Sequence, residues 1–206
     1  MKELALLSLV SCLILSCLPL CAADAHMTAE ERTKVLNWLE ESRKEFLAAI
    51  DGLSEEQWKW KPPPERWSVG ETAEHVVLAE AGLFGNVQKA IASPANPAWE
   101  EKTKGKTEFI ERVMAPRLGK AQAPEPLVPK GEMTPAQVKQ RFEKQRAEIV
   151  KFATGTEVAL KEHTADHPFP AFGTLNAYQW LIYGPLHTMR HDKQIAEVKA
   201  TAGYPK

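Results

Sequence analysis

Two histidines of this sequence have a spacing that suits metal binding. His187 and His191 are four residues apart in a segment with helical periodicity, so their side chains project from one face of a helix. Two imidazole nitrogens placed in this way can both reach one ion, at ~2.0–2.1 Å for zinc. Gln194 and Val198 continue the same stripe, so this face is expected to contact other parts of the protein.

A third histidine, His75, lies in a different helical segment, on a face that Thr72, Val76 and Ala79 mark as buried or half-buried. If that face meets the histidine pair, two helices supply three nitrogens, and helical bundles build metal sites between facing helices. Three protein ligands plus water is the pattern of an open metal site that can support catalysis. Glu71, one turn before His75, is the candidate proton acceptor for such a water.

Each of these histidines also has a simpler interpretation. A lone histidine on an apolar helix face is more often a hydrogen-bonded core residue than a ligand. The zincin pattern His-Glu-x-x-His is missing, because Thr188 follows His187 where that pattern has glutamate. His163 and His167 are also four apart, but they sit in a proline-containing loop where helical spacing does not apply. A bundle whose histidines bind no metal is therefore left open by the residues alone.

Four segments with helical periodicity must position these residues, and they predict an all-α, four-helix bundle. They run over about 28–52, from 68 to 93, from 134 onward and over about 174–200. Ser68 followed by Glu71 has the spacing of a capping box, as does Thr28 followed by Glu31. Gly184-Pro185 predicts a kink or a break in the last helix. No strand pattern and no internal repeat is evident.

The stretch 94–133 is rich in proline and predicts a long loop with one short helix near 107–114. A loop of this length is often functional, and this one could cover a site as a lid. The long connection also permits the second and third bundle helices to be parallel, while the short links on either side favour antiparallel pairs.

The N-terminal residues predict a secretory signal peptide, residues 1–25, ahead of one domain, residues 26–206. Lys2 precedes an apolar run over 4–20, and Ala23-Asp24-Ala25 offers a cleavage site after Ala25. The expected location is therefore outside the cytoplasm, in a periplasm or the extracellular space. Lipidation of Cys17, in a sequence similar to a bacterial lipobox, is a less favoured alternative.

Composition narrows the functions further. The chain has 206 residues, 44% of them hydrophobic, and a formal net charge of −1, so no nucleic-acid partner is expected. All three cysteines precede the expected cleavage site, which leaves the mature protein without thiolate ligands or disulfides. No membrane span is expected after cleavage. We expect a small-molecule substrate, which the sequence does not identify, and the sequence is compatible with a homodimer.

Two motifs resemble those of the DinB-like superfamily of four-helix-bundle proteins. Residues 67–75, WSVGETAEH, are similar to that family's Trp-Ser-x-x-Glu-x-x-x-His start of its second helix. Residues 187–195, HTMRHDKQI, are similar to its His-x-x-x-His-x-x-Gln-Ile helix. The resemblance spans roughly residues 30–202 by the order of elements and is poor over 94–133.

The resemblance implies a down-up-up-down bundle with one divalent metal ion on His75, His187 and His191. Zinc or nickel is favoured, with manganese and iron as alternatives, because imidazole suits several of these metals. Characterised relatives include metal-dependent thiol transferases and isomerases. Export separates this chain from cytosolic thiols, so a metal-dependent hydrolase is the favoured function. The alternatives are a metal-dependent thiol transferase and a non-catalytic module that binds metal or a small ligand.

Overall fold

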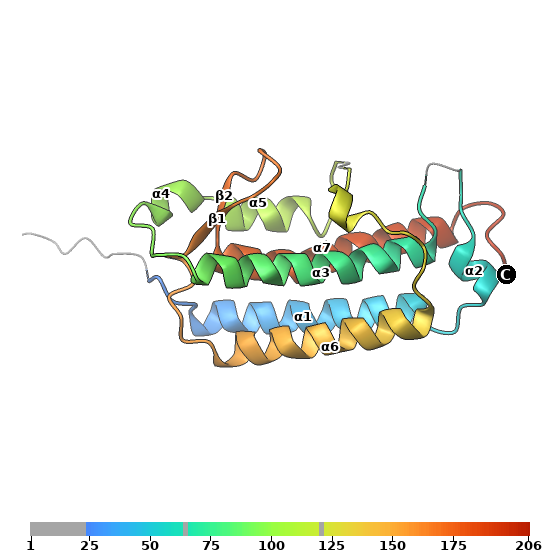
Figure 1. Ribbon diagram of the computed structural model, residues 1–206, viewed down its shortest axis with the longest axis horizontal. Coiled ribbons are helices and arrows are strands. Elements are labelled where there is room, and N and C mark those ends of the chain that lie inside the picture. Colours follow the sequence, from blue (N-terminus) through green and yellow to red (C-terminus); the bar gives the residue numbers. More distant parts are fainter. Residues whose placement is uncertain (1–23, 64–65, 120–121) are drawn as a thin grey trace, which may run out of the picture.

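Figure 1 shows a computed structural model of the chain, which describes residues 24–63, 66–119 and 122–206. Nearly all of the predicted signal peptide, residues 1–23, lies outside the described residues, and so does the candidate lipidation site Cys17. Four long helices form the predicted bundle: α1 (Ala29–Ile50), α3 (Val69–Ile91), α6 (Pro135–Gly155) and α7 (Ala177–Lys199).

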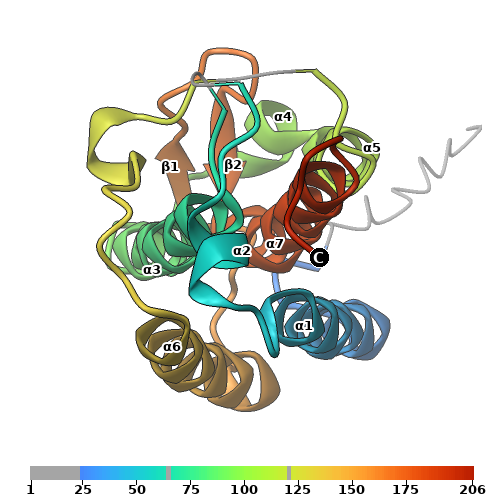
Figure 2. The ribbon, with the colours of Figure 1, turned by 90° about the vertical axis from the view of Figure 1, so that its right-hand side faces the viewer.

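The bundle helices occupy the corners of a square when viewed along their axes (Figure 2). Helices α6 and α7 each pack against both α1 and α3, so α1 is diagonal to α3 and α6 is diagonal to α7. Helices α3 and α6 run in the same direction, and α1 and α7 run in the opposite one (Figure 1). The long connection between α3 and α6 therefore joins two parallel helices, as expected from its length.

Capping residues define where the bundle helices begin. Thr28 caps α1 with Glu31, and Ser68 caps α3 with Glu71, so both predicted capping boxes are confirmed. In each box the side chain of the capping residue accepts an N–H of the first turn that has no partner within the helix. Helix α7 begins at Ala177 and not near residue 174, because Asn176 is its capping residue.

The shorter elements lie in the connections. They are α2 (Glu55–Lys59), α4 (Trp99–Thr103), α5 (Lys106–Val113), the 3-10 helix η1 (Glu125–Leu127), β1 (Thr164–Asp166) and β2 (Thr174–Asn176). Helix α5 confirms the short helix expected near 107–114, and α2, α4 and η1 were not predicted. Strands β1 and β2 form an antiparallel hairpin, which corrects the expectation of no strand. Each strand has three residues, too few to show an alternating pattern.

Helix α7 continues through Gly184-Pro185, so the expected break there is not found. Pro185 lacks an N–H, and the helical partner of the Leu181 carbonyl is therefore missing. The neighbouring turns keep the helix intact, with the Thr188 hydroxyl donating to the Gly184 carbonyl at 3.3 Å. His187 and His191 consequently belong to the same helix as Trp180.

A buried ion pair crosses the middle of the bundle. The Arg146 guanidinium on α6 lies 2.6 Å from a Glu80 carboxylate oxygen on α3, and both side chains are 1% exposed. Arg146 also donates to the Leu39 carbonyl at 2.6 Å and to the Ser42 hydroxyl at 2.7 Å, both on α1. Arg146 donates to the Thr188 hydroxyl on α7 as well, at 3.4 Å, so the pair and its hydrogen bonds join all four bundle helices. Among the described residues, no helix combines the length and apolar character needed to cross a membrane.

Candidate metal centre

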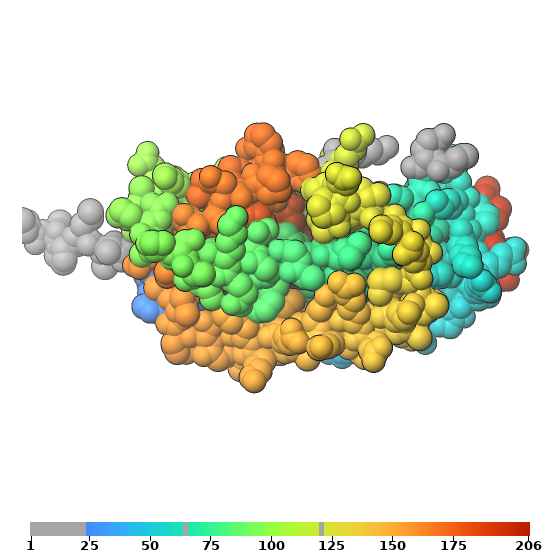
Figure 3. All heavy atoms as spheres, viewed as in Figure 1, coloured from blue at the N-terminus to red at the C-terminus, as the bar shows by residue number. Residues whose placement is uncertain are grey.

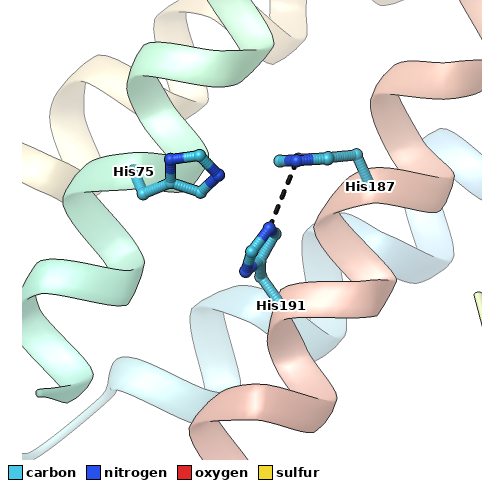
Figure 4. Close-up of side chains that lie close together, drawn as sticks. All are labelled: His75, His187 and His191. Carbon is cyan, nitrogen blue, oxygen red and sulfur yellow. Dashed lines mark hydrogen bonds between the residues drawn. The ribbon is translucent and has the colours of Figure 1, made fainter. Parts of the chain in front are cut away.

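Three histidines meet between α3 and α7, as the two motifs predicted. His75 lies on α3, and His187 and His191 lie on successive turns of α7, with all three rings pointing toward one another (Figure 4). One nitrogen of each ring lies within 4.8 Å of a nitrogen of each of the others. Since α3 and α7 are adjacent corners of the bundle, the packing of these two helices creates the cluster.

Hydrogen bonds to Nδ1 of His75 and of His191 orient the Nε2 atoms of these two rings toward the cluster. His75 donates from Nδ1 to the Leu127 carbonyl at 2.7 Å, and the Trp67 ring packs against His75 with its centroid at 4.8 Å. His191 donates from Nδ1 to Gln194 Oε1 at 3.0 Å. Histidines that bind metals commonly donate their second N–H to an oxygen acceptor in this way.

The cluster keeps its imidazoles neutral. Loss of solvent contact lowers the pKa of His75 and holds the pKa values of His187 and His191 well below 6.5, and the neighbouring histidines lower the latter two further. A neutral imidazole has a free lone pair, which is the form that coordinates a metal ion. His187 is only half-buried, so the cluster stays accessible.

The spacing of the nitrogens fits a bound divalent ion. His187 Nε2 and His191 Nε2 are 3.2 Å apart (Figure 4). Two nitrogens bound tetrahedrally to one zinc ion at ~2.1 Å would lie ~3.4 Å apart, so this pair needs little adjustment. Imidazole also suits nickel, manganese and iron, and the donor set therefore does not choose among these metals.

Glu71 does not join the histidine cluster in the structure. Its Oε2 accepts the Ser68 backbone N–H at 2.9 Å, and its Oε1 lies 2.6 Å from the Lys61 ammonium. Both oxygens are thus engaged in the cap of α3 and in an ion pair. A role for Glu71 as proton acceptor stays a prediction.

The remaining histidines lie apart from the cluster. His163 contacts the Ser93 carbonyl through Nδ1 at 2.8 Å, and His26 lies beside Asp24 near the start of the described chain. His167 packs among aromatic rings of the hairpin region and does not pair with His163. Their four-residue spacing therefore carries no metal site, as the loop context indicated.

Glu74 is a site residue that the sequence analysis did not single out. Its carboxylate is buried and accepts three backbone N–H groups, those of Lys130, Glu132 and Met133, at 2.9, 3.0 and 3.4 Å. These bonds attach the segment after η1 to α3, next to His75. One feature could have identified Glu74: it is an acidic residue in a helical stretch whose other residues are nearly all buried. A buried carboxylate requires a specific partner.

Figure 3 shows a hollow in the surface between the β1–β2 hairpin region and the η1 segment, with part of α7 visible in it. Arg190 on α7 donates to the carbonyls of Leu118 and Gly119 at 3.1 and 2.7 Å, which fixes the chain after α5 near the same end of the site. The loop expected to cover a site therefore contributes to the surroundings of this one through η1 and Leu127.

Comparisons with known proteins agree with this architecture. The chain is 27% identical over 162 residues to the uncharacterized protein YuaE of Bacillus subtilis (strain 168), covering 77% of this chain and 93% of YuaE. Its fold is similar to that of YfiT from Bacillus subtilis, with a TM-score of 0.53 and 14% identity, over 86% of this chain and 91% of YfiT. YfiT is described as a probable metal-dependent hydrolase with an unusual four-helix bundle topology.

The sequence profile of the DinB superfamily matches residues 39–195, a range that includes α3, α6 and the three histidines. The match covers the greater part of the bundle together with the connections between its helices. The chain belongs to the DinB superfamily.

Proposed function

We propose that this protein is an exported, metal-dependent hydrolase that cleaves an ester or amide bond of a small molecule. The observation that carries the proposal is the meeting of three neutral imidazoles between α3 and α7, with His187 half-buried. The description of YfiT as a probable metal-dependent hydrolase supports the same class of activity.

The residues of the chain would act mainly by orientation. The Leu127 carbonyl and Gln194 hold His75 and His191 by their Nδ1 atoms, so that their Nε2 atoms are free to face the histidine cluster. His75, His187 and His191 would hold a divalent ion, which would supply a Lewis acid that lowers the pKa of bound water toward neutrality. Hydrolysis adds water across the C–O or C–N bond, with the hydroxyl going to the acyl carbon and a proton to the leaving group.

Glu71 is the candidate acceptor for the proton that water gives up. To act in this way its carboxylate must exchange the Lys61 contact for one toward the histidine cluster. Glu71→Gln keeps an oxygen for the cap but removes the base, and Lys61→Met removes the ion pair while keeping the base. We expect Glu71→Gln to lower kcat about 100-fold, a typical contribution of a general base, and Lys61→Met to leave most activity.

The function is tested on protein purified without a histidine tag. Metal content is measured first, and then turnover of ester, amide and thiol-adduct substrates before and after chelation. Metal-dependent turnover of esters or amides without an added thiol is the expected result. Turnover that requires a thiol would identify a thiol transferase, and stoichiometric metal without any turnover would identify a binding module.

Export has its own test. Mass spectrometry of the mature protein from the source cells should find an N-terminal peptide that starts at His26. A lipid-modified N-terminus at Cys17 would contradict cleavage after Ala25 and show an anchored protein.

A further inference from the structure

The turn that follows α5 has an arginine at a position where glycine is usual. Arg117 has a backbone φ of 58°, and in the described part of the chain no other residue except glycines has a positive φ. The Arg117 N–H donates to the Met114 carbonyl at 2.9 Å, and the Leu118 N–H donates to the Val113 carbonyl at 3.2 Å. These two bonds form a Schellman motif, in which glycine commonly takes the left-handed position. A side chain there is strained, so the turn by itself gives no reason for an arginine.

The Arg117 side chain instead contacts α7. Its Nη1 donates to Gln194 Oε1 at 2.7 Å, and its Nε lies 3.0 Å from a Glu197 carboxylate oxygen. Positions 194 and 197 lie on one face of the helix, so a single guanidinium contacts both side chains. Arg190 donates to backbone carbonyls of the same turn, which fixes the place from which the Arg117 side chain extends.

Gln194 Oε1 accepts two hydrogen bonds, one from Arg117 and one from His191 Nδ1 at 3.0 Å. A glutamine amide has an acceptor end and a donor end, and a half-turn of the amide exchanges them. After that half-turn the amide NH2 group would face the guanidinium, which has donors only, so the two groups could not form a hydrogen bond. Arg117 therefore favours the orientation in which the oxygen of Gln194 faces His191.

The orientation of Gln194 decides which nitrogen of His191 carries the proton. Opposite Oε1, the neutral ring has its proton on Nδ1, and the lone pair of Nε2 faces His187 in the histidine cluster. Opposite an amide NH2 group, the ring would have its lone pair on Nδ1 and its proton on Nε2. The second form could not bind an ion through Nε2, because a ligand nitrogen must first lose its proton.

We propose that Arg117 is a positioning residue of the metal centre, which orients the Gln194 amide and thereby keeps His191 in the form that can bind an ion through Nε2. Arg117 acts only through Gln194 and does not touch the ion or the substrate. The inference rests on the metal binding in the proposed function and does not depend on hydrolysis. It gives the connection between α3 and α6 a second contact with the metal site, besides that of Leu127 with His75.

The form of the His191 ring is measured directly on the metal-free, full mature protein. Long-range ¹H–¹⁵N correlation spectra at about pH 7.5, above the histidine range, distinguish a proton on Nδ1 from one on Nε2. We expect Nδ1–H in the native protein and a shift toward Nε2–H in Arg117→Gly and in Arg117→Met. Glycine suits the backbone of this turn, so Arg117→Gly should keep its unfolding midpoint within about 4 °C of the native value. The native ring form in both variants would overturn the proposal.

Zinc affinity is the second readout, and it is measured by chelator competition. Loss of a residue that orients a metal ligand typically lowers affinity 10–100-fold, so we expect zinc to bind about tenfold more weakly to Arg117→Gly and Arg117→Met. Glu197→Gln removes the ion pair alone, and Arg112→Met removes an exposed charge of α5. Both controls should stay within about twofold of native affinity, as expected for exposed charges. An equal loss in Arg112→Met would attribute the effect to net charge and overturn the proposal.

Gln194→Glu tests the orientation itself. A carboxylate has an oxygen at each end, so it can accept the His191 Nδ1–H whichever way it is turned. In the Gln194→Glu background we therefore expect Arg117→Gly to lower zinc affinity by less than about twofold, in place of about tenfold. A full tenfold loss in that background would overturn the role of Arg117 in orienting the amide.

Failure of the proposed function would be recognised separately. If the native protein binds neither zinc nor another divalent ion, the metal-dependent function fails. The spectra of the metal-free protein still decide the role of Arg117, because they need no ion. A ring form that changes in Arg117→Gly and Arg117→Met but not in Arg112→Met supports that role, and a ring form that is the same in all three overturns it.

Discussion

The Nδ1 atom of His75 and the carbonyl oxygen of Leu127 are 2.7 Å apart. This hydrogen bond joins a metal-site histidine in the second turn of α3 to Leu127 of the η1 segment, which is 52 residues further along the chain. Because the bond fixes the rotation of the imidazole, the position of the η1 segment and the ability of His75 to bind a metal ion are coupled.

Removal of any one metal-site histidine should release the metal. We expect His75→Ala, His187→Ala and His191→Ala each to lower zinc affinity by at least about 100-fold, because two remaining imidazoles make an incomplete site. Competition with a chromophoric chelator measures the affinity. His163→Ala, outside the cluster, should bind zinc as the native protein does. Native affinity in all three site variants would show that these residues are not the ligands.

Loss of the Glu74 carboxylate should loosen the segment after η1. Glu74→Gln places an amide N–H against the backbone N–H groups of Glu132 and Met133 or of Lys130, which leaves a donor unpaired at a cost of about 1–3 kcal/mol. We expect faster proteolysis near residues 122–133 and zinc affinity lower by about 10-fold. Glu125→Gln is the control, since Glu125 is exposed in the same segment. Unchanged proteolysis in Glu74→Gln would argue that Glu74 does not hold the segment after η1 against α3.

Four histidines should reduce the stability of the metal-free protein as the pH falls below about 6.5. The folded-state pKa values of the metal-site histidines and of His167 are lowered, to about 4 for His167, while the unfolded chain titrates near 6.5. Between these values the four histidines bind more protons in the unfolded state than in the folded state, so their contribution to the free energy of unfolding decreases with decreasing pH. Burial raises the pKa of Glu80 to about 7 and that of Asp192 to about 8, and these two carboxyls contribute in the opposite direction. Urea unfolding at pH 7.5 and at pH 5 measures it, with buffers chosen on either side of the histidine range.

In the metal-loaded protein, acidification should also release the metal, because protonated imidazole cannot coordinate an ion. His167→Phe provides the internal control for the unfolding series, since it removes one titrating group and should make the pH dependence shallower. A pH dependence as steep in His167→Phe as in the native protein would contradict a neutral His167 in the folded state.

Removing one partner of the buried Glu80–Arg146 ion pair should lower the free energy of unfolding more than replacing both partners by apolar residues. Arg146→Met leaves the Glu80 carboxylate buried without its partner, and we expect a loss of about 3–5 kcal/mol in the free energy of unfolding. The double variant with Glu80→Leu should recover part of this loss. Arg141→Met, at an exposed position of α6, should change stability by less than about 0.5 kcal/mol. Chemical denaturation decides the order of the three variants, and a double variant less stable than Arg146→Met would refute the explanation.

Substituting alanine for two glycines of α3 should change the free energy of unfolding in opposite directions. A Cβ at Gly70 would lie 2.5 Å from Trp58 Nε1, and the Trp58 indole is fixed by its hydrogen bond to the Met133 carbonyl at 3.1 Å. A Cβ at Gly85 meets nothing within 4 Å. We expect Gly70→Ala to destabilise by about 1–3 kcal/mol and Gly85→Ala to stabilise by about 0.5–1 kcal/mol. Thermal unfolding measures both, and a neutral Gly70→Ala would show that Trp58 can move.

The sequence by itself determined the elements whose signals are local. Capping boxes at Thr28 and Ser68 located two helix starts, because a cap involves only residues three apart. The same locality placed His187 and His191 on one face of α7. The hairpin at residues 164–176 escaped prediction since its strands are stabilised by each other and by the bundle, and not by their own composition.

Only the tertiary structure decided which distant residues meet. Helical spacing could not show that α3 faces α7, so the place of His75 beside the pair depended on the packing of the bundle. Other contacts also join segments far apart in sequence. They are the hydrogen bond of His75 to the Leu127 carbonyl, that of Glu74 to the Lys130 N–H, and the stacking of His167 on Tyr183. The physical reason is that periodicity and capping are set by neighbours along the chain, whereas ligand geometry and the walls of a site are set by contacts that form only when the chain folds.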